Sequence, residues 1–359
     1  MNTTEIAGDG SNSTDVIDTG PCVRLVFRNI TIFDCEQFPP SLQLPYRKIT
    51  GPQLVLWGVV LPIIGVLGLI CNTLTFMVLR RHSLNSTFLV FLRVLVISDI
   101  LVVVLVPAHS TIETYLAFSF SSKFIYFKDK TTAFVLLCLH YLASTSFTWN
   151  VWLSVVITVD RFISLCFPLR ASSIRSTHYA RRTIVFTTVF VVAFRIPYYL
   201  TTTVISCGIP GCYMYSFTRI GEMQWNTVYR KWPTSLVNFI VPLCLLFALN
   251  ACILYKLNQF ASKRKMMISG AQEDLNSVSH RKEREWNLAV ALVITVFVVC
   301  QTPVFVEDFF WFDNDTLGQV FVFSVNILIV LNSSVNIFIY TAMGKSFRKE
   351  LMQLISCKP

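Results

Sequence analysis

The chain has 359 residues, of which 54% are hydrophobic and only 14% are charged. A soluble domain is about one quarter charged, so the composition excludes an ordinary soluble protein and indicates an integral membrane protein. The formal net charge of +10 does not indicate a nucleic-acid partner, because Lys and Arg gather on alternate connections between apolar segments. Cytoplasmic loops attract these residues, so the positive charge is a signal of membrane topology.

The first 52 residues are expected to form an extracellular tail. The first 20 residues contain no apolar core of a cleavable signal peptide, so the first membrane helix is expected to act as the insertion signal. Arg80 and Arg81 follow that helix and are expected to hold its end in the cytoplasm. Sequons for N-glycosylation agree with an outer tail and recur in a later outer loop. The candidate glycosylated residues are Asn2, Asn12, Asn29 and Asn314.

Seven apolar segments are long enough to cross a bilayer, which takes about 20 helical residues. Helices are expected, because membrane barrels use alternating segments of about ten residues. The predicted fold is therefore all-α, a seven-transmembrane helix bundle over residues 53–343. The segments are Gln53–Leu79, Phe88–Ile112, Thr131–Leu165, Arg181–Thr203, Thr234–Leu257, Trp286–Phe312 and Leu317–Met343.

Residues 344–359 are expected to form a short amphipathic helix on the cytoplasmic membrane surface, followed by a tail. The helix is predicted over Lys345–Ile355, where apolar and basic residues fall on opposite faces. Cys357 is a candidate for palmitoylation, and an unmodified thiol is an equal alternative. The apolar face is made of Phe347, Leu351, Leu354 and Ile355.

The second apolar segment carries an acid, Asp99, near its middle. An unpaired carboxylate inside a bilayer costs roughly 3 kcal/mol, so Asp99 is expected to face the bundle interior and to have polar partners. A ring of hydroxyl and amide oxygens around an acid suits a small hard cation such as sodium. A hydrogen-bonded network without an ion is the alternative. The candidate partners are Asn72, Ser146, Asn150, Asn332, Ser333 and Asn336.

The third apolar segment ends on an adjacent acid and base, Asp160 and Arg161. Arg161 is positioned either to pair with Asp160 or to reach Glu283, an acid that leads into the sixth segment. An ion pair that breaks and re-forms as helices move is a two-state element, whereas simple snorkelling of Arg161 into water is the alternative. Pro303 lies within the sixth segment and is expected to kink it.

Acids interleaved with aromatic residues gather where the expected outer connections meet the helices. They suit a short peptide bearing Arg and Phe, through charge-assisted hydrogen bonds and cation–π contacts. The alternative is a solvated loop beside an interfacial aromatic belt. The candidate pocket residues are Glu113, Glu307, Asp308, Phe309 and Trp311.

Cysteines on the expected outer side are candidates for disulfide bonds. Cys22 and Cys35 lie in the tail, and Cys207 and Cys212 lie in the loop between the fourth and fifth segments. Four cysteines allow three pairings, so a small loop closed by Cys207 and Cys212 and a tail-to-loop pairing are both open.

From Gln53 to Cys357 the chain resembles the rhodopsin-like (class A) G-protein-coupled receptors in an ordered set of motifs. Within that class, the stretch WLSVVITVDRFISLCFPLR is similar to invertebrate neuropeptide receptors of the FMRFamide-receptor type. The matching residues are Asn72, Asp99, Asp160-Arg161-Phe162, Pro242, Phe297-x-x-Cys300-x-x-Pro303, Asn336-x-x-x-Tyr340 and Phe347-Arg348.

The resemblance implies a plasma-membrane receptor with an extracellular N-terminus. Its ligand is expected to be a short RFamide-like neuropeptide, and its partners a heterotrimeric G protein and arrestin. By the same resemblance, Arg161 enters the G-protein interface, Glu283 restrains it at rest, and Tyr340 swings inward on activation. Asp99, together with Ser146 and Asn150, would hold sodium in the inactive state.

The chain also departs from the motifs of that family. Gln301 stands where the family has a tryptophan in the sixth helix, and Ile337 replaces the proline of the seventh. The family's third-helix disulfide cysteine would fall at Leu136, whereas Cys138, a further disulfide candidate, points about 200° around the helix. These departures leave two alternatives open: a receptor-like binder with weak or no G-protein signalling, and a non-peptide class A receptor.

Other classes of function find less support. Ala143 stands where amine receptors place an Asp, and Val330 where opsins place the retinal lysine, so neither ligand is expected. The sequence shows no catalytic pattern, so an enzyme is not expected. It also lacks the inverted repeats and paired broken helices of a transporter.

Overall fold

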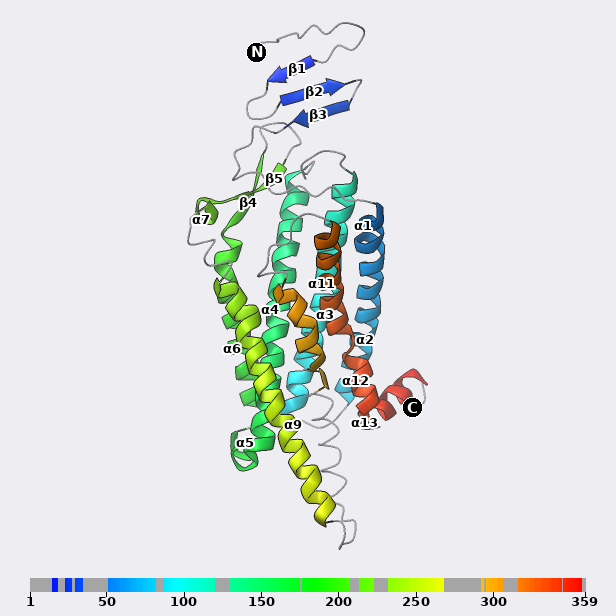
Figure 1. The fold of residues 1–359 in the computed structure, drawn as a ribbon, viewed down its shortest axis with the longest axis vertical. Coiled ribbons are helices and arrows are strands. Elements are labelled where there is room, and N and C mark those ends of the chain that lie inside the picture. The colour runs from blue at the N-terminus through cyan, green and yellow to red at the C-terminus, as the bar shows by residue number, and fades with distance from the viewer. Residues whose placement is uncertain are drawn as a thin grey trace.

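The computed structural model describes most of the chain from residue 51 to residue 356, together with three strands near the N-terminus. Within these residues, long helices lie side by side in an elongated bundle (Figure 1). The described ranges are 15–18, 23–27, 30–34, 51–81, 87–119, 129–174, 176–206, 213–222, 232–267, 292–293, 295–306, 316–343 and 345–356.

The bundle has two distinct ends, which we name after the element that each carries. The hairpin end carries strands β4 (Thr202–Ser206) and β5 (Tyr213–Phe217), and the α13 end carries helix α13 (Lys345–Ile355) (Figure 1). The remaining helices are α1 (Gly51–Val55), α2 (Leu61–Arg81), α3 (Thr87–Ser119), α4 (Lys130–Cys166), α5 (Pro168–Ile174), α6 (Thr177–Tyr199), α7 (Arg219–Glu222), α9 (Val241–Met267), α11 (Thr316–Ser334), α12 (Asn336–Met343) and the helix Thr295–Val306.

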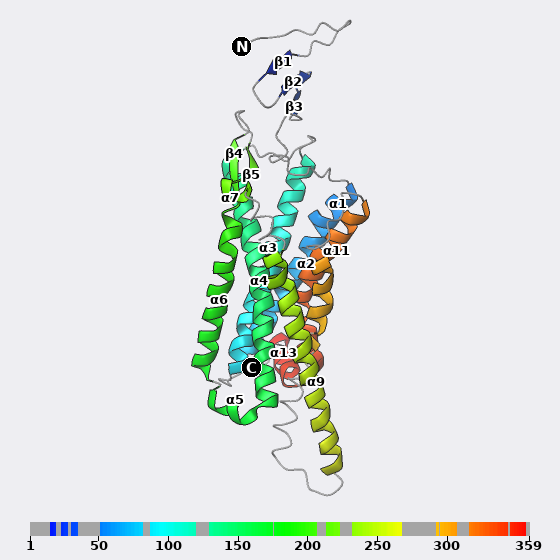
Figure 2. The ribbon, with the colours of Figure 1, turned by 60° about the vertical axis from the view of Figure 1, so that its left-hand side comes forward.

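Each of the seven predicted segments contains a described helix. Among the described residues, four helical stretches are long and apolar enough to cross a membrane, and the bent pair α11–α12 would make a fifth. Helix α6 has 23 residues and packs along α4 (Figure 2). The four stretches are Gly51–Arg81, Thr87–Tyr115, Lys130–Cys166 and Trp232–Gln259.

Several helix ends differ from the predicted segments. Helix α3 continues to Ser119 rather than Ile112, and α9 continues to Met267 rather than Leu257. Both figures of the whole chain show α9 projecting past α13 (Figures 1 and 2). Hydropathy marks only the part of a helix that suits the bilayer, whereas residues such as Lys and Gln continue a helix well in water.

Proline alters the start of two helices. A π-helical segment over Leu56–Val60 precedes α2 and another over Leu236–Ile240 precedes α9, and each ends two residues before a proline, Pro62 or Pro242. Pro62 has no N–H to donate to the carbonyl of Gly58, four residues earlier. That carbonyl instead accepts a hydrogen bond from the Tyr115 hydroxyl at 3.3 Å.

The seventh segment is bent by 42° between α11 and α12. Val335 lies at the break, where the Phe338 N–H donates to the Val335 carbonyl at 3.0 Å in a three-residue step. This bend forms although Ile337 stands where the receptor motif has proline.

Two small antiparallel sheets accompany the predicted helix bundle. Strands β1 (Asp15–Asp18), β2 (Val23–Phe27) and β3 (Ile30–Asp34) pair in chain order, and β4 pairs with β5. Short strands of four or five residues carry little periodic signal, which is why the apolar pattern did not reveal them.

The β4–β5 hairpin rests on apolar residues of α4. Leu136 is 2% exposed, and with Ala133 it packs against Val204, Tyr213 and Tyr215. Cys138 is a free thiol, so the prediction of a disulfide at this residue is wrong. Leu136 packs against the hairpin, and Cys138 lies two residues on, about 200° around the helix.

The predicted amphipathic helix coincides with α13. Phe347 is fully buried, Leu351 is buried, and Leu354 packs against the same core. Ile355 does not join that packing, because it is 64% exposed.

Glycines let α2 approach its neighbours closely. A Cβ added at Gly65 would lie 2.8 Å from the carbonyl oxygen of Val103 and 2.9 Å from Cγ of Pro107, both on α3. A Cβ at Gly68 would collide with the Ser334 hydroxyl of α11. Small residues at such contacts allow helix backbones to pack tightly in membranes.

Gly65→Ala is expected to lower the free energy of unfolding by roughly 1–3 kcal/mol, because α3 must move to admit the methyl group. Thermal unfolding of the purified protein in detergent measures this. Gly51→Ala is the matched control, since an added Cβ there meets nothing within 4 Å. Equal melting temperatures for the two variants would contradict the prediction.

Candidate functional site

Helix α4 carries polar side chains at three levels of the bundle. His140 lies toward the hairpin end, Asn150 lies near the middle, and the Asp160–Arg161 pair lies near the α13 end. The helix is continuous from Lys130 to Cys166 and packs against α3, α6 and α9. A single rigid element therefore connects all three levels.

At the middle level, the carboxylate of Asp99 is 1% exposed and accepts hydrogen bonds on both oxygens. Asn150 Nδ2 donates to Oδ1 at 2.7 Å, and Asn336 Nδ2 donates to Oδ2 at 2.8 Å. The Ser333 side chain also hydrogen-bonds to Asp99. Residues from α3, α4, α11 and α12 thus meet at one acid, as the sequence predicted for a buried carboxylate.

Asn72 joins the same region by a different route. Its Nδ2 donates to the carbonyl of Ser333 at 2.7 Å and to that of Gly68 at 3.0 Å, so it ties α2 to α11. Ser146 and Asn332 are both buried, at 7% exposure. Among the described residues, the side chains that hydrogen-bond to Asp99 do not include these two.

The donors around Asp99 favour one of the two interpretations of this site. A sodium ion needs oxygen ligands, but Asn150 and Asn336 turn amide N–H groups toward the carboxylate. This arrangement forms a hydrogen-bonded network around the acid. Binding of sodium at Asp99 stays a prediction.

At the α13 end, Arg161 is held inside the bundle rather than snorkelling into water. Its Nη2 lies 2.8 Å from Oδ2 of Asp160, and the two side chains are 6% and 2% exposed. The guanidinium also stacks over the ring of Phe88, 3.8 Å from the ring centroid. Removing either partner would leave a buried charge, so the pair is a strong local constraint.

The other residues assigned to the switch have different surroundings. Tyr340 is 1% exposed, and its ring centroid lies 5.7 Å from that of Phe347 on α13. Pro303 is half-buried in the helix Thr295–Val306. Glu283 lies outside the described residues, so a bridge between it and Arg161 stays a prediction.

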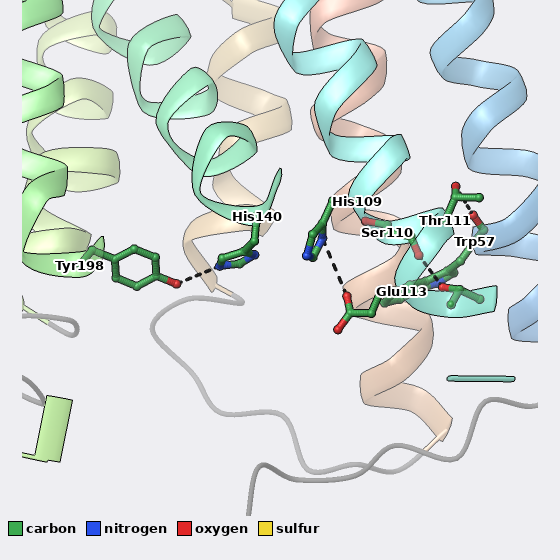
Figure 3. A network of polar contacts seen from close by, with 8 residues as sticks. Trp57, His109, Ser110, Thr111, Glu113, His140 and Tyr198 are labelled. Atoms are coloured by element: carbon green, nitrogen blue, oxygen red, sulfur yellow. Dashed lines mark hydrogen bonds and ion pairs between the residues drawn. The ribbon is translucent and has the colours of Figure 1, made fainter. Parts of the chain in front are cut away.

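Near the hairpin end, polar side chains of three helices face one another (Figure 3). His109 Nδ1 lies 3.8 Å from Glu113 Oε2 on α3, and the His109 and His140 rings are 5.0 Å apart. His140 Nε2 lies 3.0 Å from the Tyr198 hydroxyl of α6. Glu113, the described member of the predicted pocket, therefore belongs to a polar cluster.

The hairpin covers this cluster closely enough to respond to its charge. Burial raises the pKa of Tyr215 on β5, and the negative charge of Glu113 raises it further. Tyr215 therefore stays neutral and can act as a hydrogen-bonding group beside the acid. The carboxylate, imidazoles and phenols together can bind a cationic or hydrogen-bonding ligand group.

A second polar network, which the sequence analysis did not assign, joins three helices. Arg195 of α6 is 4% exposed; its Nε donates to Thr148 Oγ1 at 3.0 Å and its Nη2 to the Ser144 carbonyl at 3.1 Å. Thr148 in turn donates to Asn238 Oδ1 at 3.2 Å, just before α9. An Arg within an apolar helix was the available signal, but Thr148 and Asn238 follow only from the folded chain.

Some predicted site residues fall outside the described part of the chain, so their predictions are untested. They are Glu283, Glu307, Asp308, Phe309, Trp311, Cys22, Cys35, Cys207, Cys212, Asn2, Asn12, Asn29, Asn314 and Cys357.

Asp99→Ala is expected to lower the melting temperature, because the buried amides of Asn150 and Asn336 would lose their acceptor. Each abandoned donor costs about 1–3 kcal/mol. Asp99→Asn keeps one acceptor oxygen, so its melting temperature should fall between those of the native protein and Asp99→Ala. Leu101→Ala on the exposed side of α3 is the control for truncation. A variant Asp99→Ala that melts with the native protein would contradict the network.

Comparison with known proteins agrees with this arrangement. The chain matches the family model described as 7 transmembrane receptor (rhodopsin family) over residues 71–340, well over half its length. The FMRFamide receptor of Drosophila melanogaster is 24% identical over 304 residues, which cover 81% of this chain and 52% of the relative. The chain therefore spans about half the length of that receptor.

Vertebrate relatives match over most of their length. The thyrotropin-releasing hormone receptor of Gallus gallus is 25% identical over 337 residues, covering 85% of this chain and 79% of the relative. The somatostatin receptor type 5 of Rattus norvegicus is 24% identical over 327 residues, with the same two coverages. The predicted resemblance is confirmed, and the family consists of receptors rather than enzymes. This chain is a membrane protein that belongs to the rhodopsin family of seven-transmembrane receptors.

Proposed function

We propose that the protein is a plasma-membrane receptor for a short extracellular peptide and that it activates a heterotrimeric G protein. An RFamide-like peptide is the first choice, because the matched relatives are named for FMRFamide, thyrotropin-releasing hormone and somatostatin. The hairpin end and the N-terminal tail would face the outside, and the α13 end would face the cytoplasm.

The observation that carries the proposal is the continuity of α4. This helix bears His140 beside the outer polar cluster, Asn150 on the Asp99 carboxylate, and the buried Asp160–Arg161 pair. A ligand that binds at the hairpin end and favours another packing of α4 would thereby change the environment of Arg161. Such coupling requires only that the ligand bind one of two packings more tightly.

The inner ion pair supplies the two-state element of this proposal. Arg161 is committed to Asp160 and to the face of Phe88 in this structure. Released from Asp160, the guanidinium would offer five donors to the carbonyl or carboxylate groups of a partner protein. Asn336 and Tyr340 on α12 would adjust with it, because Asn336 is bound to the central acid.

An exposed apolar residue supports a protein partner at the same end. Leu169 follows α4 on the short helix α5 and is 88% exposed. Large apolar side chains displayed beside a buried switch are typical of protein–protein interfaces. The proposed G-protein surface therefore includes Leu169 and the region around Arg161.

The remaining assignments stay proposals on sequence grounds. They comprise N-glycosylation of the tail, palmitoylation of Cys357, restraint of Arg161 by Glu283, a contribution of the run Glu307–Trp311 to the pocket, and binding of arrestin. A disulfide between Cys207 and Cys212 is supported by the pairing of their neighbours Ser206 and Tyr213 across the hairpin.

A receptor-like binder with weak signalling is the second candidate. Gln301 and Ile337 replace two residues of the motif set, and this observation favours it. Ligand binding without nucleotide exchange on any G protein would establish this candidate over the first. A non-peptide ligand would instead produce exchange with small molecules and none with peptides.

Arg161→Ala is expected to reduce peptide-stimulated nucleotide exchange by at least tenfold, because the proposed interface loses its cation. Peptide binding to the hairpin end should stay within threefold of the native value. Radioligand binding and GTP exchange in membranes measure the two effects separately. Arg93→Ala is the control, since Arg93 lies at the same end but donates to the Leu79 carbonyl. Undiminished exchange in Arg161→Ala would refute the assigned role.

Glu113→Gln is expected to lower the affinity for an Arg-containing peptide about tenfold, because one charge-assisted hydrogen bond is lost. The same change should leave an analogue with citrulline in place of Arg nearly unaffected, because citrulline carries no charge. Asp129→Asn is a matched control at an exposed N-cap that holds Thr132. If the substitution lowers the affinity of the two peptides equally, Glu113 does not bind the cation.

A further inference from the structure

Gln301 carries a buried carboxamide. It belongs neither to the network around Asp99 nor to the ion pair of Arg161. Gln301 is 3% exposed, and its Oε1 finds no hydrogen-bond donor among the described residues. Buried polar atoms in native proteins are nearly always hydrogen-bonded, so an orphaned acceptor needs an explanation. A bound ligand group that donates to it is one such explanation.

The surroundings of Gln301 are apolar on both sides. Residues three and four positions apart share a helix face, so Gln301 lies between Phe297 and Val304. Phe297 belongs to the core that contains Tyr340, whereas Val304 packs with Phe239 and Val325. The carboxamide therefore lies where two apolar clusters meet.

Gln301 lies deep in the bundle, one helical turn before Val304. Phe239, which packs with Val304, directly follows Asn238, and Asn238 accepts from Thr148. The polar network of Arg195 therefore adjoins the same apolar cluster. A ligand entering past that network would meet Gln301 at its deepest point.

We propose that Gln301 recognises a neutral primary carboxamide at the end of the ligand, an inference that rests on the proposed peptide-receptor function. A glutamine side chain presents an acceptor and a donor side by side. A primary carboxamide presents the same two groups in reverse order, so the pair forms two parallel hydrogen bonds. A carboxylate has no donor for Oε1, and an ammonium group has no acceptor for Nε2.

The apolar enclosure strengthens the preference for a neutral group. Moving a charged carboxylate among Phe239, Val304 and Phe297 is far less favourable than moving an amide whose hydrogen bonds are satisfied. The one buried cation that we place near this level, Arg195, is engaged with Thr148 and Ser144 of α4 and stacks near Tyr198. The site therefore selects an amidated terminus over a free acid.

The test compares short peptides that end in Arg-Phe, each made as the C-terminal carboxamide and as the free acid. Nucleotide exchange is measured in membranes containing the native receptor, Gln301→Met or Thr302→Val. Methionine matches glutamine in length but cannot hydrogen-bond as an amide. Thr302 is the control, because it is exposed on the same helix and its hydroxyl donates to the Val298 carbonyl. Melting temperatures without peptide are measured in parallel.

The native receptor and Thr302→Val should prefer the carboxamide at least tenfold. Gln301→Met should lose that preference through a weaker response to the carboxamide, and its melting temperature should equal or exceed the native value because an orphaned acceptor is removed. Equal potency of the two peptides at the native receptor would overturn the inference alone. A lower melting temperature in Gln301→Met would also overturn it, since the amide would then have a structural partner.

Two further outcomes separate this inference from the function on which it rests. A native receptor that prefers the free acid would assign the deep end of the site to Arg195 and overturn the role of Gln301. A native receptor that responds to no peptide, amidated or acidic, would overturn the peptide-receptor function and this inference together.

Discussion

The arrangement of the bundle depends on one constraint, the need to satisfy a carboxylate buried among apolar helices. Asp99 cannot reach water, so its two oxygens must find donors within the protein. Asn150 and Asn336 supply them, and each donor fixes the position of its own helix relative to α3. The central acid therefore sets the relative register of α3, α4 and α12. The polar groups at the two ends of α4 are positioned by that same register.

Elementary rules were enough to predict most of the bundle. Apolar runs located a helix in all seven segments, and the pattern from Lys345 to Ile355 gave α13 with its correct bounds. The two sheets and the long ends of α3 and α9 were not predicted, because they lie where the bilayer no longer imposes an apolar pattern. The π-helical segments were also missed, since a proline predicts a disturbance but not its form.

The central site was predicted more fully than either end. A lone acid in a membrane helix demands partners, and three of the candidates named for Asp99 hydrogen-bond to it. Asn72 instead binds the Ser333 carbonyl, a choice that depends on how closely α2 approaches α11. Thr148 and Asn238 carry no charge and follow no motif, so only folding reveals that they join Arg195. Leu136 was known from the sequence, but its contact with the hairpin was not.

The bend between α11 and α12 has a further consequence. A proline in place of Ile337 would lack the N–H that normally returns to the Ser333 carbonyl, and the break would be permanent. Ile337 retains that N–H, while the Ser333 carbonyl is also the acceptor of Asn72. A carbonyl oxygen has two lone pairs, so this one can accept from the backbone and from Asn72 together. The break in the seventh segment therefore keeps the N–H that a proline would remove, and the carbonyl on its other side is tied to α2 through Asn72.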